Sequence, residues 1–426
     1  MSAVRNRFQN YIKQQKALSF RNYRLFVVGQ TFSLIGTWIQ RMAMMWLVYR
    51  MTNSAFLLGL VGFCEQIPIL ILAPFAGVYA DRWDKHKALS RIDTLAMLQA
   101  LALGLLTLFN MVAVWHLILL SLLLGMVNAF EVPVRQSLVV DMVGRDKFSL
   151  QNAIALNSTV FNLSRLIGPS IAGILIGSLG EGWCFMANAF SYAVVVSSLL
   201  MMRNIDVVSQ IKKQKHQVFT QLQEGFQYVR HTSTMKSLLI VLAIVSFANA
   251  SIRTLGSVFA KDVLHGNAGT LGILMSAVGV GAIIGALFLT KNRSGLTLKR
   301  IVSFTGIFLG IAMIAFGTSS WLPLSLIFLA FCGLAQMMHT ATTNTLLQLN
   351  VDDDKRGRVM SFYTVCLQGT MPIGSLVAGS LAGWFGGPWA ISIMGLICLL
   401  GALFFKEKNL LTHWLKRKNK ATSCIV

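Results

Sequence analysis

The sequence predicts an all-α integral membrane protein with twelve transmembrane helices, arranged as two pseudo-symmetric six-helix bundles. Three observations support this fold class: an apolar composition, twelve apolar stretches, and an internal repeat. Of the 426 residues, 55% are hydrophobic and 12% are charged. The mean hydropathy is +0.65, which is too apolar for a soluble globular protein of this length.

Twelve apolar stretches have the composition of membrane spans. A helix needs about 20 residues to cross about 30 Å of hydrocarbon, and most of the stretches reach that length. They cover residues 25–48, 56–80, 94–110, 113–134, 150–177, 183–202, 237–260, 269–290, 301–319, 321–346, 359–384 and 388–405.

The second six spans repeat the first. Residues 167–173 (IGPSIAG) align with residues 373–379 (IGSLVAG), and the same offset places the fifth span on the eleventh. In transporters, such parallel repeats enclose a cavity near the membrane midplane. The predicted domains are an N-terminal tail (1–20), a first bundle (21–202), a cytoplasmic linker with an amphipathic helix (203–236), a second bundle (237–405) and a basic tail (406–426).

Basic residues occupy alternate connections. Of the 37 Lys and Arg residues, 32 lie in the N-terminal tail, the even-numbered loops and the C-terminal tail. Because basic residues near span ends stay in the cytoplasm, both termini are expected on the cytoplasmic side of the membrane. The membrane itself is expected to be the bacterial cytoplasmic (inner) membrane. The net charge of +22 is then explained by loops facing lipid headgroups, and nucleic-acid binding is not expected.

The sequence contains no phosphate-binding Walker loop, no cluster of metal ligands and no arrangement of nucleophile and base. Five of its six cysteines lie within or at the edge of apolar spans, show no metal-ligand spacing and are expected to be free buried thiols. The sixth, Cys424, lies in the basic tail, which is expected at the membrane surface. We therefore expect no enzymatic activity, no ATP-driven transport, no cofactor and no metal.

A charged segment follows the second span and reads Gly77-Val-Tyr-Ala-Asp81-Arg82-Trp-Asp84-Lys85-His86-Lys87. It resembles the signature loop of the major facilitator superfamily, GxxxD(R/K)xG(R/K)(R/K). Four positions fit the pattern: Gly77, Asp81, Arg82 and Lys85. The segment departs from it at Asp84, where glycine is usual, and at His86, whose basic role Lys87 takes one position later.

Asp81 is expected to face the start of the eleventh span, near Gly357 to Ser361, where Arg356 and Arg358 supply basic charge. Unpaired N–H groups and the helix dipole at a helix start favour an anion. The predicted contact is a latch that holds the cytoplasmic side closed. The alternative is that Asp81 and Arg82 only mark the membrane interface and orient the helix.

The fifth span contains Gly168-Pro169 and, after them, Ala172 and Gly173. It resembles the GPxxGG element of proton-coupled exporters in this superfamily, with Ala172 in place of the first glycine of the closing pair. Glycine and proline allow bending and close helix packing. Gly281 and Gly285 in the eighth span offer a small-residue partner face. Close helix packing without any role in export would favour the same residues, so the element supports both interpretations.

Further segments resemble the branch that contains the enterobactin exporter and macrolide efflux proteins. The resemblance covers roughly residues 20–405. The segments that carry it are Asn128-Ala-Phe-Glu131-Val-Pro133-Val-Arg135-Gln, Asp141-Met-Val, Asn152-Ala-Ile-Ala-Leu-Asn157 and Arg356-Gly357-Arg358-Val-Met-Ser361.

Ionisable residues inside the spans are candidates for substrate binding and proton coupling. A charge at the bilayer centre costs at least about 2.5 to 3.5 kcal/mol and is usually paired or facing water. The candidates are Arg41, Glu65, Glu131, Arg165, Arg253 and His339. Arg41 and Glu65 are expected to pair, either for coupling or only for structure, and His339 is either a proton carrier or a packing residue.

The predicted function is secondary active transport. The resemblance implies a proton-coupled exporter of a small amphipathic or anionic molecule, siderophore-like first and a drug or macrolide second, working by alternating access. Alternatives are an importer of a siderophore or metabolite, a lysophospholipid transporter and, from another class, a non-transporting receptor or scaffold. The expected partners are substrate, protons and membrane lipids, with the protein acting as a monomer.

Overall fold

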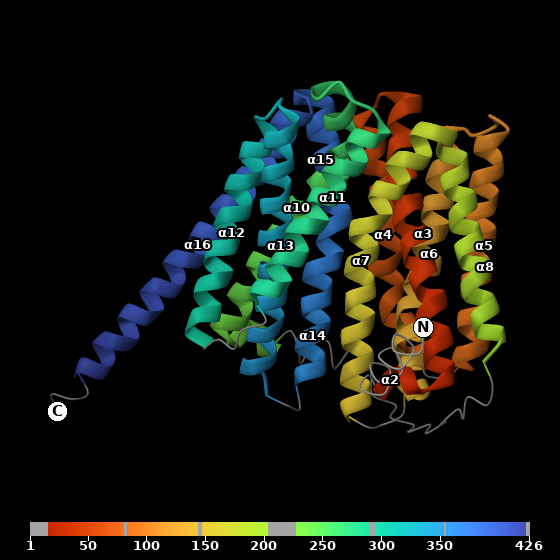
Figure 1. The fold of residues 1–426 in the computed structure, drawn as a ribbon. Helices are drawn as coiled ribbons and strands as arrows, with labels where there is room; N and C mark the ends of the chain where they lie inside the picture. Colours follow the sequence, from red (N-terminus) through yellow and green to blue (C-terminus); the bar gives the residue numbers. More distant parts are fainter. Residues whose placement is uncertain are drawn as a thin grey trace, which may run out of the picture.

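The computed structural model describes residues 16–80, 83–143, 147–202, 227–289, 295–352 and 355–422. These ranges are helical throughout apart from short connections (Figure 1). Eleven of their helices are long and apolar enough to cross a membrane. Helix α3 (Arg21–Thr52) is also long enough, but polar residues such as Gln30, Gln40 and Arg41 lower its hydropathy. The predicted all-α membrane fold is therefore confirmed, with α3 packed among the eleven as the twelfth long helix.

The first half of the chain forms one set of packed helices. Helix α3 contacts α7 and α8, α4 contacts α6, and α5 contacts both α6 and α8. Before α3 lies the four-residue helix α2 (Lys16–Ser19). The other long helices of this half are α4 (Ala55–Ala80), α5 (Lys85–Leu108), α6 (Val114–Val143), α7 (Lys147–Leu179) and α8 (Glu181–Leu200).

The second half packs in a similar way, with α11 and α12 against α13, and α10 against α15 and α16. Two of its spans contain a π-helical segment, a feature that often marks functional sites. Its elements are α10 (Ser233–Val258), η1 (Phe259–Val263), α11 (Ala268–Phe288), α12 (Gly295–Gly317), α13 (Leu322–Asn350), α14 (Arg356–Thr364), η2 (Val365–Gly369), α15 (Thr370–Phe385) and α16 (Gly387–Thr422).

The two ends of the bundle differ. We call the end at which α3 begins and α8 ends the terminal face; in Figure 1 it is the lower end, toward which α2 and the last turns of α16 lie. The other end is the opposite face. The halves meet toward the opposite face, where α4 packs on α15 and α7 packs on α11.

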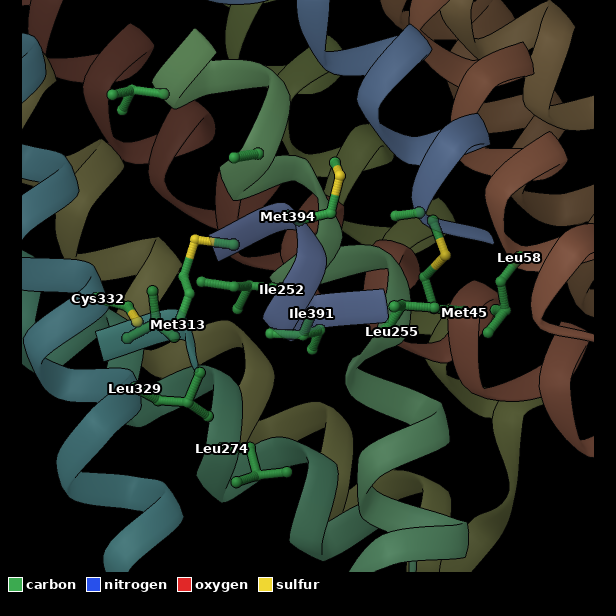
Figure 2. Packing of buried hydrophobic residues seen from close by; sticks show 14 of the residues in the cluster. Met45, Leu58, Ile252, Leu255, Leu274, Met313, Leu329, Cys332, Ile391 and Met394 are labelled. Atoms are coloured by element: carbon green, nitrogen blue, oxygen red, sulfur yellow. The ribbon is translucent and has the colours of Figure 1, made fainter. Parts of the chain in front are cut away.

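The hydrophobic core joins the halves on the side of the opposite face. One cluster of buried residues contains Met45 and Leu58 of the first half together with Leu255 and Leu274 of the second (Figure 2). A separate cluster, which includes Tyr23 and other residues close to the terminal face, draws only on helices of the first half. Apolar packing therefore ties the halves together at one end more than at the other.

Several helices extend beyond the predicted spans. The third span was predicted to begin at residue 94, whereas α5 begins at Lys85. Asp84 caps this helix, because its Oδ1 accepts a hydrogen bond from the Lys87 backbone N–H at 3.2 Å. The charged first turns of α5 lower the local hydropathy without ending the helix, so the predicted boundary was wrong by nine residues. Most of the predicted linker (203–236) lies outside the described residues, and its residues 227–231 are helical.

Candidate functional site

A cavity of about 1420 Å³ lies between the two halves. It is lined by α3, α4, α6 and α7 on one side and by α10, α11, α13, α14, η2 and α15 on the other. Arg135 of α6 and Arg358 of α14, both near the terminal face, belong to the lining. Apart from its chain neighbours and its own helix backbone, no atom of the described residues lies within 4 Å of the place where a Cβ on Gly357 would be. The cavity therefore extends to the terminal face.

The opposite face is closed by direct contacts between the halves. A Cβ on Gly59 of α4 would lie 2.6 Å from the Ser375 carbonyl oxygen of α15. Tyr49 donates a hydrogen bond to Asp262, and Lys261 Nζ donates to Asn53 Oδ1 at 2.6 Å. These bonds join the end of α3 to η1, so the cavity is sealed at this end.

The expected ion pair between Arg41 and Glu65 is present. Arg41 Nε lies 2.9 Å from Glu65 Oε1, and both side chains line the cavity. The Arg41 guanidinium also lies 5.6 Å from the centre of the Trp38 ring, and that ring meets Phe161 edge-on. The pair links α3 to α4 in the cavity wall.

Glu131 is held by a partner that the sequence prediction missed. Arg135 lies one helical turn after Glu131 on α6, and its Nη1 is 2.7 Å from Glu131 Oε1. Both residues line the cavity. The fourth span was predicted to end at residue 134, which left Arg135 in a loop. The spacing of four residues between an acid and a base is the available signal for such a pair on a helix.

Two arginines in the cavity have no carboxylate partner among the described residues. Arg165 of α7 forms no hydrogen bond or ion pair with any described residue, and Arg253 Nη2 contacts only the Met371 sulfur, at 3.5 Å. Arg41, Glu65 and Arg165 all act electrostatically on Arg253. Because the two cavity glutamates are already paired, positive charge remains unbalanced at the centre.

The cavity is more basic than the sequence predicted. The candidates from the sequence include three arginines and two glutamates, and the structure adds Arg135 and Arg358 to the bases in the lining. A buried guanidinium that lacks a partner is costly unless it faces water or an anion. The lining therefore favours an anionic ligand, which arginine binds through its planar fork of donors.

Other lining groups suit a ligand with both polar and apolar parts. Five buried polar atoms in the wall have no hydrogen-bond partner among the described residues: Gln30 Nε2, Trp38 Nε1, Asn128 Nδ2, Arg135 Nε and Gln336 Oε1. Leaving such a group unpaired costs about 1 to 3 kcal/mol, so water or ligand is expected to satisfy it. Five flexible apolar side chains also face the cavity: Met42, Met45, Met275, Met337 and Met371.

His339 lies away from the cavity. It is fully buried between α12 and α13, and its Nδ1 lies 3.2 Å from both Thr305 Oγ1 and the Val302 carbonyl oxygen. Of the two roles weighed for His339, this position favours packing. The other five candidate residues are brought together around one cavity.

The signature loop is only partly within the described residues. Asp81 and Arg82 lie outside them, and Gly77 is described only as part of α4, so the latch stays a prediction. Lys85 Nζ forms an ion pair with Asp141 Oδ2 at 2.7 Å, which ties α5 to α6. In the second half, across the cavity from α4, the first turn of α14 is formed by Arg356, Gly357 and Arg358.

Asp84, which departs from the loop pattern, and Lys87, which supplies its second base one position late, have a local role. Burial raises the pKa of Asp84, but hydrogen bonds from Lys87 and the charges of Lys87 and His86 outweigh it and hold that pKa below its ordinary value. The carboxylate therefore stays ionised as the cap of α5. Aspartate and glycine are both accepted at helix N-caps, which accounts for the exchange with the usual glycine.

The glycines of the fifth and eighth spans serve close packing. A Cβ on Gly168 would clash with Trp38 of α3, and one on Gly173 would lie 3.1 Å from the Cα of Gly269 in α11. Pro169 lies inside α7, and its carbonyl oxygen faces Gly272. α7 therefore packs on the first turns of α11.

Gly281 and Gly285 do not face α7. A Cβ on Gly285 would lie 2.8 Å from the Leu334 carbonyl oxygen, and Gly281 meets Ala330, so their partner helix is α13. Gly279, two residues before Gly281, faces Leu166 of α7. Two residues correspond to about 200° around a helix, so these glycines lie on opposite sides of α11.

A family model described as "transmembrane secretion effector" matches residues 16–422. The staphyloferrin A transporter of Staphylococcus aureus is 28% identical over 91% of this chain and 96% of its own length. The multidrug efflux pump Tap of Mycolicibacterium fortuitum is 25% identical over 82% and 86%. Macrolide efflux protein A of Streptococcus pyogenes is 24% identical over 83% and 87%.

Solved transporter structures share the fold. The nucleoside transporter NupG superposes with a TM-score of 0.71 at 13% identity, covering 93% of this chain and 98% of its own. An inward-facing, occupied structure of a bacterial homolog of the human lysosomal transporter Spinster gives 0.72 at 14% identity, covering 91% and 96%. At such low identity these likenesses concern the fold alone.

Proposed function

This chain belongs to the transmembrane secretion effector family of major facilitator superfamily transporters, and we propose that it exports a small anionic or amphipathic molecule in exchange for protons. The observation that carries the proposal is the pair of cavity arginines, Arg165 and Arg253, that lack a carboxylate partner. An anionic substrate would supply the missing charges. The family and its relatives are transporters, not enzymes.

A siderophore-like substrate fits this cavity best. Iron-chelating molecules carry several carboxylate, catecholate or hydroxamate groups, which Arg165 and Arg253 can hold in two-point fashion. The relative named as a staphyloferrin A transporter supports the same class. Drug or macrolide export is the second candidate, because Trp38, Phe161 and the cavity methionines offer an adaptable apolar surface.

The proposed mechanism is alternating access, with the terminal face in the cytoplasm of a bacterial cell. In the present state the cavity extends to that face, and we propose that substrate enters it from there. Rocking of the halves about the central site then closes the terminal face and opens the opposite one. We propose that the chain does this as a monomer in the cytoplasmic membrane, surrounded by lipid.

Transport is tested with everted membrane vesicles that are energised to be acidic inside. We expect them to accumulate iron-free staphyloferrin A, and a protonophore should abolish the accumulation. Accumulation of a macrolide alone would select the second candidate. Uptake by intact cells, without accumulation in everted vesicles, would identify an importer. Movement of lysophospholipid alone would identify a lipid transporter. If no probe moves, a receptor or scaffold is favoured.

The proposed orientation predicts which residues an impermeant thiol reagent can reach from outside intact cells. In a cysteine-free background, Lys212→Cys should be protected, because the basic linker is expected in the cytoplasm. Asn110→Cys, in the connection between α5 and α6 at the opposite face, is the matched control and should be labelled readily. Labelling of residue 212 from outside would overturn the topology.

A further inference from the structure

A third carboxyl group lies inside the first half, behind the cavity wall. Asp93 of α5 is only 2% exposed and does not line the cavity. It lies eight residues into the helix, about 12 Å along its axis. Within the described parts of the chain it forms no hydrogen bond or ion pair. An acid buried in a helix bundle without a partner is costly, and in a membrane protein such an acid is usually functional.

The groups near Asp93 come from two helices that pack on α5, namely α6 and α8. Ile92 and Ala96, which flank Asp93, belong to one buried cluster with Val134 of α6 and Tyr192 of α8. From α6, Glu131 and Arg135 act electrostatically on Asp93. From α8, the Tyr192 hydroxyl lies within the electrostatic reach of both Asp93 and Glu131. Along α5 itself, Arg91 is exposed, and Lys85 is engaged by Asp141.

Tyr192 extends the cluster toward α3. Its hydroxyl lies 3.5 Å from Thr37 Oγ1, and Thr37 lines the cavity together with Glu131 and Arg135. The cluster of Asp93, Glu131, Arg135 and Tyr192 therefore has one side at the cavity and one side inside the bundle. A proton can reach it from cavity water through Glu131.

The charges of this cluster balance only when it holds one proton. Two carboxylates face a single guanidinium, so full ionisation leaves one negative charge buried, and neighbouring carboxyls that cannot both ionise share a proton. Arg135 pairs with Glu131, which leaves Asp93 as the carboxyl without a counter-ion. Arg135 Nε is also buried without an acceptor, so the guanidinium keeps a donor for a second carboxylate.

We propose that Asp93 is the residue that binds the exchanged proton, and that Arg135 controls its release by pairing with Glu131 or with Asp93. While Arg135 holds Glu131, as in this cytoplasm-open state, Asp93 is a neutral acid that carries the proton taken up in the state open at the opposite face, and that proton has yet to be released to the cytoplasm. When Arg135 turns to Asp93, the ionised form is stabilised and the proton leaves. The assignment deepens the proposed function and rests on it for its role in transport.

Infrared spectroscopy tests proton binding without any substrate. The purified protein at neutral pH should show the carbonyl stretch of a protonated carboxylic acid, sensitive to deuterium exchange. Asp93→Asn should remove this band and Asp93→Glu should shift it. The matched control Asp352→Asn, which changes an exposed aspartate near the terminal face, should leave it unchanged. A wild-type protein without the band, or a band that survives Asp93→Asn, would overturn the assignment.

Transport assays then test coupling. With staphyloferrin A as the probe, Asp93→Asn vesicles should lose accumulation driven by the proton gradient, to less than a tenth of the wild-type level. They should keep exchange of labelled for unlabelled probe, which needs no net proton movement. Loss of both activities in a protein with normal thermal unfolding would make Asp93 structural, and retained accumulation would also reject the role. If the wild type moves no probe, the proposed function fails while the infrared result still decides proton binding.

Discussion

Replacing Arg165 with glutamine is expected to lower transport at least about tenfold. Hydrogen bonds to charged groups contribute about 1.5 to 3 kcal/mol, and each 1.4 kcal/mol corresponds to a factor of ten in binding. Arg165→Lys keeps the charge but loses the planar fork, so its transport should lie between those of wild type and Arg165→Gln. The measurement is the initial rate of staphyloferrin A accumulation in everted vesicles, divided by the amount of protein in the membrane.

Folding should not suffer in the glutamine variant. Because Arg165 has no carboxylate partner in the described structure, its removal leaves no opposite charge unpaired, and the thermal unfolding midpoint should be unchanged or higher. Arg50→Gln is the matched control, since Arg50 pairs with Glu181 at the opposite face, outside the cavity. Its transport should remain near the wild-type rate. Full transport by Arg165→Gln would move the substrate site to Arg41, Glu65 and Arg253.

Gly59→Leu is expected to shift the protein toward a state that is open at the opposite face. In the present state a Cβ at position 59 would lie 2.6 Å from the Ser375 carbonyl oxygen and 3.0 Å from the Cα of Gly379, so α4 and α15 must separate. Overpacking of this kind costs about 1 to 3 kcal/mol. The cost applies only while α4 and α15 touch. The equilibrium between the two access states should therefore shift by about 5- to 150-fold toward the state open at the opposite face. Transport should fall because the return to the state open at the terminal face becomes unfavourable.

Spin labels report the shift directly. Cysteines at Gln151 of α7 and Gln348 of α13 are exposed at the terminal face, one on each half, and their separation should shorten in Gly59→Leu. Gly383→Leu, on α15 but facing open space, should leave both the distance and transport unchanged. Unchanged distances in Gly59→Leu would mean that close approach of α4 and α15 does not hold the opposite face shut.

Helix ends explain the errors of the sequence reading. A hydropathy boundary marks where lipid contact ends, whereas a helix continues until its backbone is capped or broken. Asp84 caps α5 well before the predicted third span begins, and α6 continues past its predicted span to Val143. Asp93 and Arg135 lie in these extra turns. They were therefore read as loop residues, although both lie inside packed helices.

The sequence by itself determined the membrane fold, because every backbone polar group in lipid must be satisfied within its own segment and a long apolar stretch must then be a helix. It also supplied most of the charged residues at the cavity, since a charge in a span is rare enough to stand out. Only the tertiary structure decided their partners. Arg135 holds Glu131, Arg165 faces the cavity without a carboxylate, and His339 lies behind the wall. The physical reason is that pairing and burial depend on which helix faces meet, and those contacts join residues far apart in the chain.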